Sequence, residues 1–93
     1  MNSVNNYLDK EGKIKVWPSK HDSRLLVLEY LADKFQYNHF YSEKEVNNII
    51  ENYHTFEDYF LLRRELIESK LLSRTRNGAK YWRTEESVTE EKI

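Results

Sequence analysis

The chain has 93 residues, of which 33% are charged, with a formal net charge of −1 and no cysteine. This length suits one domain, and the 14% of aromatic residues can supply a core without disulfides, which excludes a wholly disordered chain. No apolar run is long enough to span a membrane, and the polar N-terminus lacks the apolar segment of a signal peptide. We therefore expect a small, soluble, cytoplasmic domain.

The first third of the chain predicts an extended segment followed by a helix. Residues 1–12 are polar and rich in asparagine, which favours a flexible lead-in. Residues 13–16 alternate polar and apolar, as a short half-buried extended segment does. Ser19 is a favourable N-cap, and with Asp22 it predicts a helix that runs to about Lys34. The apolar face of this helix comprises Leu25, Val27, Leu28, Leu31, Ala32 and Phe35.

Two apolar side chains of this helix fall outside that face. Leu26 and Tyr30 lie four residues apart on the opposite side, so they need a second cover. The cover could be the Ile14–Trp17 segment or another protein chain. Leu26 and Tyr30, together with Leu61 further along, are therefore a candidate protein interface.

A connector and a second helix follow. Residues 38–41 form the connector, which could include a very short strand. Ser42 and Glu45 give the S-x-x-E pattern of a capping box, which predicts a helix over about residues 43–53. Its buried positions are expected to be Val46, Ile49 and Ile50.

A third helix is expected over about residues 55–69, with Thr55 and Asp58 at its start. We assign it an apolar face of Phe56, Tyr59, Phe60, Leu62, Leu66 and Ile67. The opposite face then holds Glu57, Asp58, Leu61, Arg64, Glu65 and Glu68. Four acids on one face would repel phosphates, which argues against deep insertion into a DNA groove. Arg63 falls within the apolar face, where it is expected either to pair with a carboxylate such as Glu29 or Glu45 or to contact a phosphate.

The C-terminal third predicts a β-hairpin. Asn77-Gly78 favours a two-residue type I′ turn between strands at 71–76 and 79–84, so that Arg74 pairs with Tyr81 and Arg76 with Ala79. Residues 85–93 form an acidic tail that we expect to be frayed. The order of these elements predicts a mostly α, α+β domain over 13–84, of the winged helix-turn-helix class.

Five stretches of the chain carry a resemblance to a known family. They are residues 12–18 (GKIKVWP), 27–32 (VLEYLA), 41–47 (YSEKEVN), 62–66 (LRREL) and 81–83 (YWR). Together they resemble a small prokaryotic domain family of unknown function, over most of residues 12–83. That family occurs alone and as a C-terminal appendage to helix-turn-helix transcriptional regulators, so the resemblance implies a regulatory association. It implies no catalytic or ligand-binding residue.

Catalytic patterns are weak in this chain. The two glycines are far apart, so they do not form a phosphate-binding loop. His21, His39 and His54 are widely separated and have no neighbouring ligand at helical spacing. We expect neither enzymatic activity nor a metal or cofactor.

Basic residues gather on the predicted hairpin beside Tyr81 and Trp82. Trp82 is expected to pack in the core near Leu71. The candidate nucleic-acid contacts are Arg74, Arg76, Lys80 and Arg83, with Arg64 and Lys20 as further candidates. These charges could instead only protect the hairpin edge from aggregation. The sequence favours a winged-helix module of transcriptional-regulator type with weak or partner-assisted binding of duplex DNA. The alternative is a module for protein interaction or homodimerisation, and neither hypothesis involves a membrane.

Overall fold

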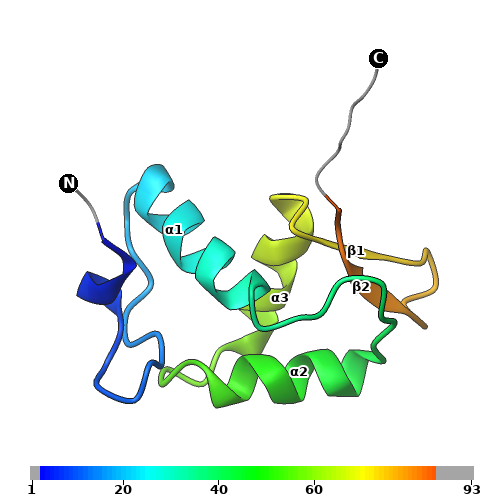
Figure 1. The fold of residues 1–93 in the computed structure, drawn as a ribbon, viewed down its shortest axis with the longest axis horizontal. Helices are drawn as coiled ribbons and strands as arrows, with labels where there is room; N and C mark the ends of the chain where they lie inside the picture. Colours follow the sequence, from blue (N-terminus) through cyan, green and yellow to red (C-terminus); the bar gives the residue numbers. More distant parts are fainter. Residues whose placement is uncertain (1–2, 86–93) are drawn as a thin grey trace.

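Three α-helices and a C-terminal hairpin make up the computed structural model, which describes residues 3–85 (Figure 1). The elements in chain order are a 3-10 helix η1 (Val4–Tyr7), α1 (His21–Ala32), α2 (Glu43–Asn52), α3 (Tyr59–Glu68), β1 (Leu72–Arg74) and β2 (Tyr81–Arg83). The predicted α+β class is confirmed, and the layout is consistent with a winged helix. No helix within the described residues is long and apolar enough to cross a membrane. Most of the predicted tail, residues 86–93, lies outside the described range.

One hydrophobic core joins the three helices to the hairpin. Its fully buried members include Val27, Leu31, Val46, Ile50, Leu62, Leu66 and Leu72. Burial of each such side chain is worth about 1.5–3 kcal/mol relative to exposure. The predicted apolar face of the first helix is confirmed except for Leu25, which is only half-buried.

The start of α1 differs from the prediction. Ser19 is not the N-cap, because the helix begins at His21 and Lys20 occupies the cap without a side-chain hydrogen bond. Arg24 donates from Nε to the carbonyl of the buried Pro18 at 2.7 Å, and this bond holds the preceding bend outside the helix. The helix also ends at Ala32, two residues before the predicted end.

The N-terminal segment has regular structure where a flexible lead-in was expected. After η1, the Asp9 carboxylate accepts hydrogen bonds from the backbone N–H groups of Glu11 and Lys13, each at 2.9 Å, and forms a tight turn. Ile14 then pairs with Leu8 on one side and with His54 on the other. The turn before Ile14, rather than the expected Ile14–Trp17 segment, contacts Tyr30, whose hydroxyl donates to the Gly12 carbonyl at 2.6 Å.

Helix α2 begins as predicted, whereas α3 begins later. The capping box of Ser42 and Glu45 is complete, with both reciprocal hydrogen bonds present. Helix α3 starts only at Tyr59, with Asp58 as its N-cap. The buried His54 explains the delay: its Nδ1 bonds the Ile50 carbonyl and its Nε2 accepts from the Asp58 N–H, both at 2.8 Å. These bonds hold residues 54–58 as a loop.

The hairpin keeps the predicted register but not the predicted turn. Arg74 pairs with Tyr81, as expected. The two-residue turn is wrong: a wider loop closes with a bond from Thr75 N–H to the Lys80 carbonyl. The Thr75 hydroxyl accepts from the N–H groups of Ala79 and Lys80, which stabilises this wider loop. Arg76 and Ala79 consequently lie in the loop rather than opposite each other. Tyr41 pairs with Tyr81 through two bonds of 2.8 Å, so the connector contributes a single-residue β-bridge rather than a strand.

Candidate nucleic-acid interface

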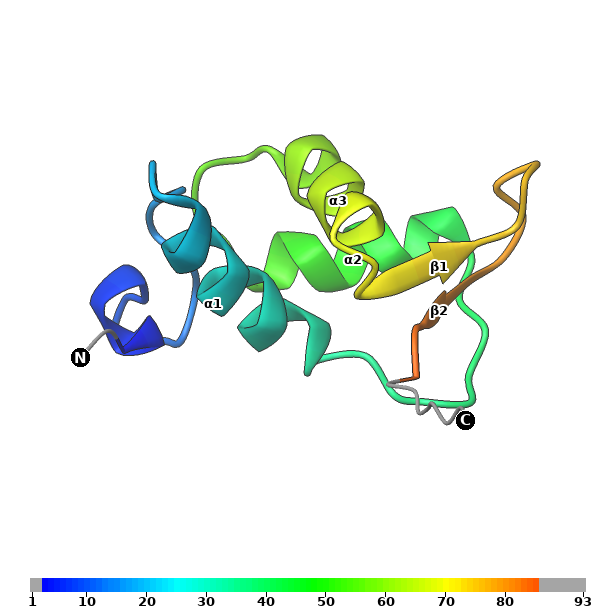
Figure 2. The same cartoon turned by 90° about the horizontal axis from the view of Figure 1, so that it is seen from above.

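A shallow groove of about 440 Å³ runs between α3 and the hairpin, and we call it the basic groove. Its α3 side is formed by Phe60, Arg63, Arg64, Ile67 and Glu68. Its other side is formed by Glu43 at the start of α2 and by the hairpin residues Arg74, Arg76, Asn77, Gly78 and Tyr81. Four arginines and two glutamates thus line this groove, although the whole chain has a net charge of −1. The hairpin projects beyond the helices, and its first strand follows directly from the end of α3 (Figure 2).

The acidic face expected for the third helix is corrected by the structure. Glu57 and Asp58 belong to the loop before α3, because His54 delays the start of the helix. Glu65 is half-buried and lines a different hollow with His21 and Arg24 of α1. Of the four acids that argued against a phosphate-binding surface, only Glu68 lines the basic groove.

Phe60 also lies on the opposite side of α3 from its predicted position. Phe60 is 58% exposed and lines the basic groove rather than the core. Leu62 and Leu66 are the two buried residues of this helix. A helical wheel centred on those two leucines, at ~100° per residue, places Phe60 outside the apolar arc and Arg64 directly opposite it. The spacing of Leu62 and Leu66 therefore indicates the buried side of α3, and the predicted apolar face was too wide.

Arg63 is held in place at the side of the groove. Its Nη1 donates to Asn47 Oδ1 at 2.6 Å and lies 3.4 Å from Glu43 Oε2, and its side chain is 13% exposed. Its guanidinium also stands over the Phe60 ring, 5.2 Å from the centroid. Pairing with a carboxylate is confirmed, but the partner is Glu43 rather than Glu29 or Glu45. Because the charges of Arg63 and Glu43 largely cancel, the positive field of the groove comes from Arg64, Arg74 and Arg76, with Glu68 opposing them.

The other three arginines of the groove are exposed. Arg74 donates from Nη1 to the carbonyls of Thr75 and Arg76 at 3.2 and 3.3 Å, which folds it along the hairpin loop. Within residues 3–85, the side chains of Arg64 and Arg76 make neither a hydrogen bond nor an ion pair. These two guanidinium groups therefore keep all their donors available for a ligand.

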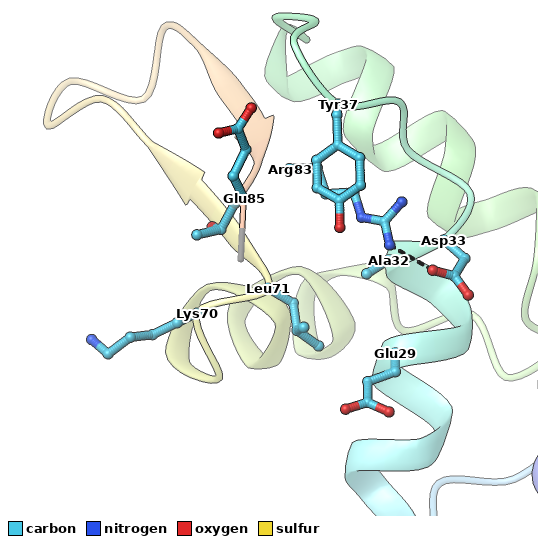
Figure 3. Close-up of a pocket in the computed structure, with 9 residues that line it drawn as sticks. Glu29, Ala32, Asp33, Tyr37, Lys70, Leu71, Arg83 and Glu85 are labelled. Carbon is cyan, nitrogen blue, oxygen red and sulfur yellow. Dashed lines mark hydrogen bonds and ion pairs between the residues drawn. The ribbon is translucent and has the colours of Figure 1, made fainter. Parts of the chain in front are cut away.

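Arg83 has a structural contact instead of a place in this groove. Figure 3 shows its guanidinium beside the Asp33 carboxylate and the Tyr37 ring. Its Nη2 donates to Asp33 Oδ1 at 2.6 Å, and its Cζ lies 4.0 Å from the Tyr37 ring centroid. The pair joins β2 to the end of α1, fifty residues away in the sequence. The structure thus places Arg83 apart from Arg74 and Arg76.

Lys80 and Trp82 lie around a second hollow, on another part of the hairpin. The Lys80 ammonium stands 4.9 Å from the centroid of the Phe40 ring, and Trp82 packs edge-on against the same ring at 5.7 Å. Trp82 is half-buried, so it does not join the fully buried core near Leu71 as expected. Phe40 is 59% exposed.

The remaining candidate residues are separate from the basic groove. Lys20 directly precedes α1, which starts at the far end of the molecule from the hairpin (Figure 1). Tyr30 is half-buried, and its hydroxyl donates to the Gly12 carbonyl of the N-terminal segment. Leu26 and Leu61 are half-buried. Among residues 3–85, no group of three or more His, Cys, Asp or Glu side chains could hold a metal ion.

A known family model matches most of the chain. The family model described as "Uncharacterized protein conserved in bacteria (DUF2087)" matches residues 13–83, from the extended segment to the last strand. The chain belongs to this family. No curated protein and no solved structure is significantly similar to it. The DUF2087 domain therefore coincides with the unit that holds the core and the basic groove, while η1 and the Asp9 turn precede it.

Proposed function

We propose that this DUF2087 domain binds duplex nucleic acid through the basic groove, as a winged-helix module of transcriptional-regulator type. The observation that supports this most is the position of four arginines in one groove between α3 and the hairpin. In a winged helix, these two elements would contact the major groove and the adjacent backbone. The exposed side of α3 would enter the groove of the duplex, while Arg74 and Arg76 contact phosphates.

The charge distribution predicts weak binding. Phosphate contacts supply most of the non-specific affinity by releasing counterions, and the groove offers only a few free cations. Glu68 stands beside them and opposes the phosphate backbone. We therefore infer that the domain binds together with a partner, such as a second DNA-binding protein, or at low affinity by itself.

The test is a salt titration of duplex binding by fluorescence anisotropy. For the wild type we expect a linear log–log plot, whose slope is about −0.9 for each phosphate contacted. The double variant Arg74→Ala/Arg76→Ala should reduce the magnitude of the slope by about 1.8. Lys10→Ala/Lys15→Ala is the matched control, since it removes the same charge from exposed residues outside the groove. Equal slopes for the two double variants, or no binding at low salt, would refute the proposal.

A second candidate function is protein interaction or homodimerisation through the other hollow of the hairpin. It is favoured by the exposed Phe40 ring, which packs with Trp82 and Lys80 outside the core. An exposed aromatic cluster of this kind is common at protein interfaces. Light scattering should then give a dimeric mass for the wild type and a monomeric mass for Phe40→Glu. A wild-type monomer would exclude homodimerisation through this hollow.

A further inference from the structure

The side of α3 that faces the basic groove presents two chemically different groups, one turn apart. Phe60 offers an exposed phenyl ring, and Arg64 offers a guanidinium without a partner among the described residues. Four residues of helix separate them by ~6 Å along the axis. Because successive bases are about 3.4 Å apart along each strand, the two side chains can meet bases within about two steps of each other.

The neighbouring arginines Arg63 and Arg64 have different roles, because only Arg63 is held by other residues. Its bond to Asn47 and its ion pair with Glu43 fix it at the edge of the groove. The same guanidinium stands over the Phe60 ring and holds that ring near the open side of α3. Arg64 is exposed and has no hydrogen-bond or ion-pair partner in the part of the chain that the structure describes, so its side chain can adapt to a ligand. The structure thus provides an oriented apolar contact and a movable donor pair on the same helix.

Each group matches one base edge of the DNA major groove. An arginine donates two hydrogen bonds to O6 and N7 of guanine, and a phenyl ring contacts the C5-methyl group of thymine. Uracil lacks that methyl group, and the major groove of A-form RNA is too deep and narrow for side chains to read. We infer that the ligand is B-form DNA, in which Arg64 reads a guanine and Phe60 reads a thymine within about two base steps. This inference rests on the proposed function of the basic groove.

The experiment uses a pool of DNA duplexes with a randomised ten-base-pair centre. Selection with the wild-type chain should enrich sites that contain guanine and thymine within about two steps. The best site is then prepared in unmodified form, with uracil for thymine, with 7-deazaguanine for guanine, and as an RNA duplex. We expect 7-deazaguanine to weaken binding at least about fivefold and uracil about two- to fivefold, with still weaker binding to RNA.

Two variants connect each effect to its residue. For Phe60→Ala, uracil should no longer reduce the binding affinity, whereas 7-deazaguanine should still reduce it. For Arg64→Ala, 7-deazaguanine should no longer reduce the affinity, whereas uracil should still reduce it. Both side chains are exposed, and melting curves establish that each variant folds. If binding depends on salt but has equal affinity for all the DNA forms, the proposed base readout is wrong, while duplex binding through the basic groove is still supported. Equal or tighter binding to RNA would overturn the choice of DNA. If the pool does not bind at low salt, the inference and the proposed function both fail.

Discussion

The substitution Arg63→Met should destabilise the fold by about 2 kcal/mol, mainly through its bond to Asn47. That bond is short at 2.6 Å, and the Arg63 side chain is only 13% exposed. A hydrogen bond to a charged group contributes about 1.5–3 kcal/mol. The ion pair with Glu43 adds less than about 1 kcal/mol, because the Glu43 side chain is 53% exposed and lies 3.4 Å away. Methionine keeps the apolar stem of the side chain, so packing changes little.

A double-mutant cycle measures the contribution of each partner. Urea unfolding is followed by the fluorescence of Trp17 and Trp82 for Arg63→Met, Asn47→Ala, Glu43→Gln and the two pairwise combinations. We expect a coupling energy of about 1–2 kcal/mol with Asn47 and below about 1 kcal/mol with Glu43. Arg64→Met is the matched control and should change stability by no more than about 0.5 kcal/mol. If Arg63→Met behaves like this control, or if the coupling to Glu43 is the larger one, the reasoning is wrong.

Three further predictions concern the backbone and one carboxylate. Lys70 follows α3 with φ 67°, a left-handed conformation that glycine adopts without strain. Lys70→Gly should therefore stabilise the fold by about 0.5–1 kcal/mol, measured by thermal melts. A loss of stability would show that the Lys70 side chain contributes to the fold. Gly12→Ala should lower the free energy of unfolding by about 1 kcal/mol or more. The φ angle of Gly12 is 82°, and a Cβ atom there would lie 3.0 Å from the Tyr30 hydroxyl oxygen. An unchanged melting temperature would contradict this prediction. Backbone hydrogen bonds, that of Lys13 above all, lower the pKa of Asp9. The wild type should therefore be more stable than an Asp9→Asn variant at neutral pH, and this difference in stability should decrease as acid protonates the Asp9 carboxylate. A difference in stability that does not change with pH would refute this cause.

The sequence determined those features that depend on residues within a few positions of each other. The capping box of Ser42 and Glu45 uses side chains three residues apart, so its pattern is readable directly. The apolar spacing of the first helix predicted its buried face for the same reason. The register of Arg74 with Tyr81 also followed from the sequence, although the hydroxyl of Thr75 stabilised a wider loop than Asn77-Gly78 indicated.

The tertiary structure decided what depends on distant partners. His54 pairs with Ile14 through the backbone and bonds Asp58 through its ring, and this arrangement removed two acids from the third helix. The roles of the arginines were decided in the same way. Arg83 is held by a carboxylate fifty residues away, while Arg64 and Arg76 line the basic groove without a side-chain partner among residues 3–85. An arginine has the same chemistry in each place, so only the three-dimensional position of its partners distinguishes a structural contact from a binding group.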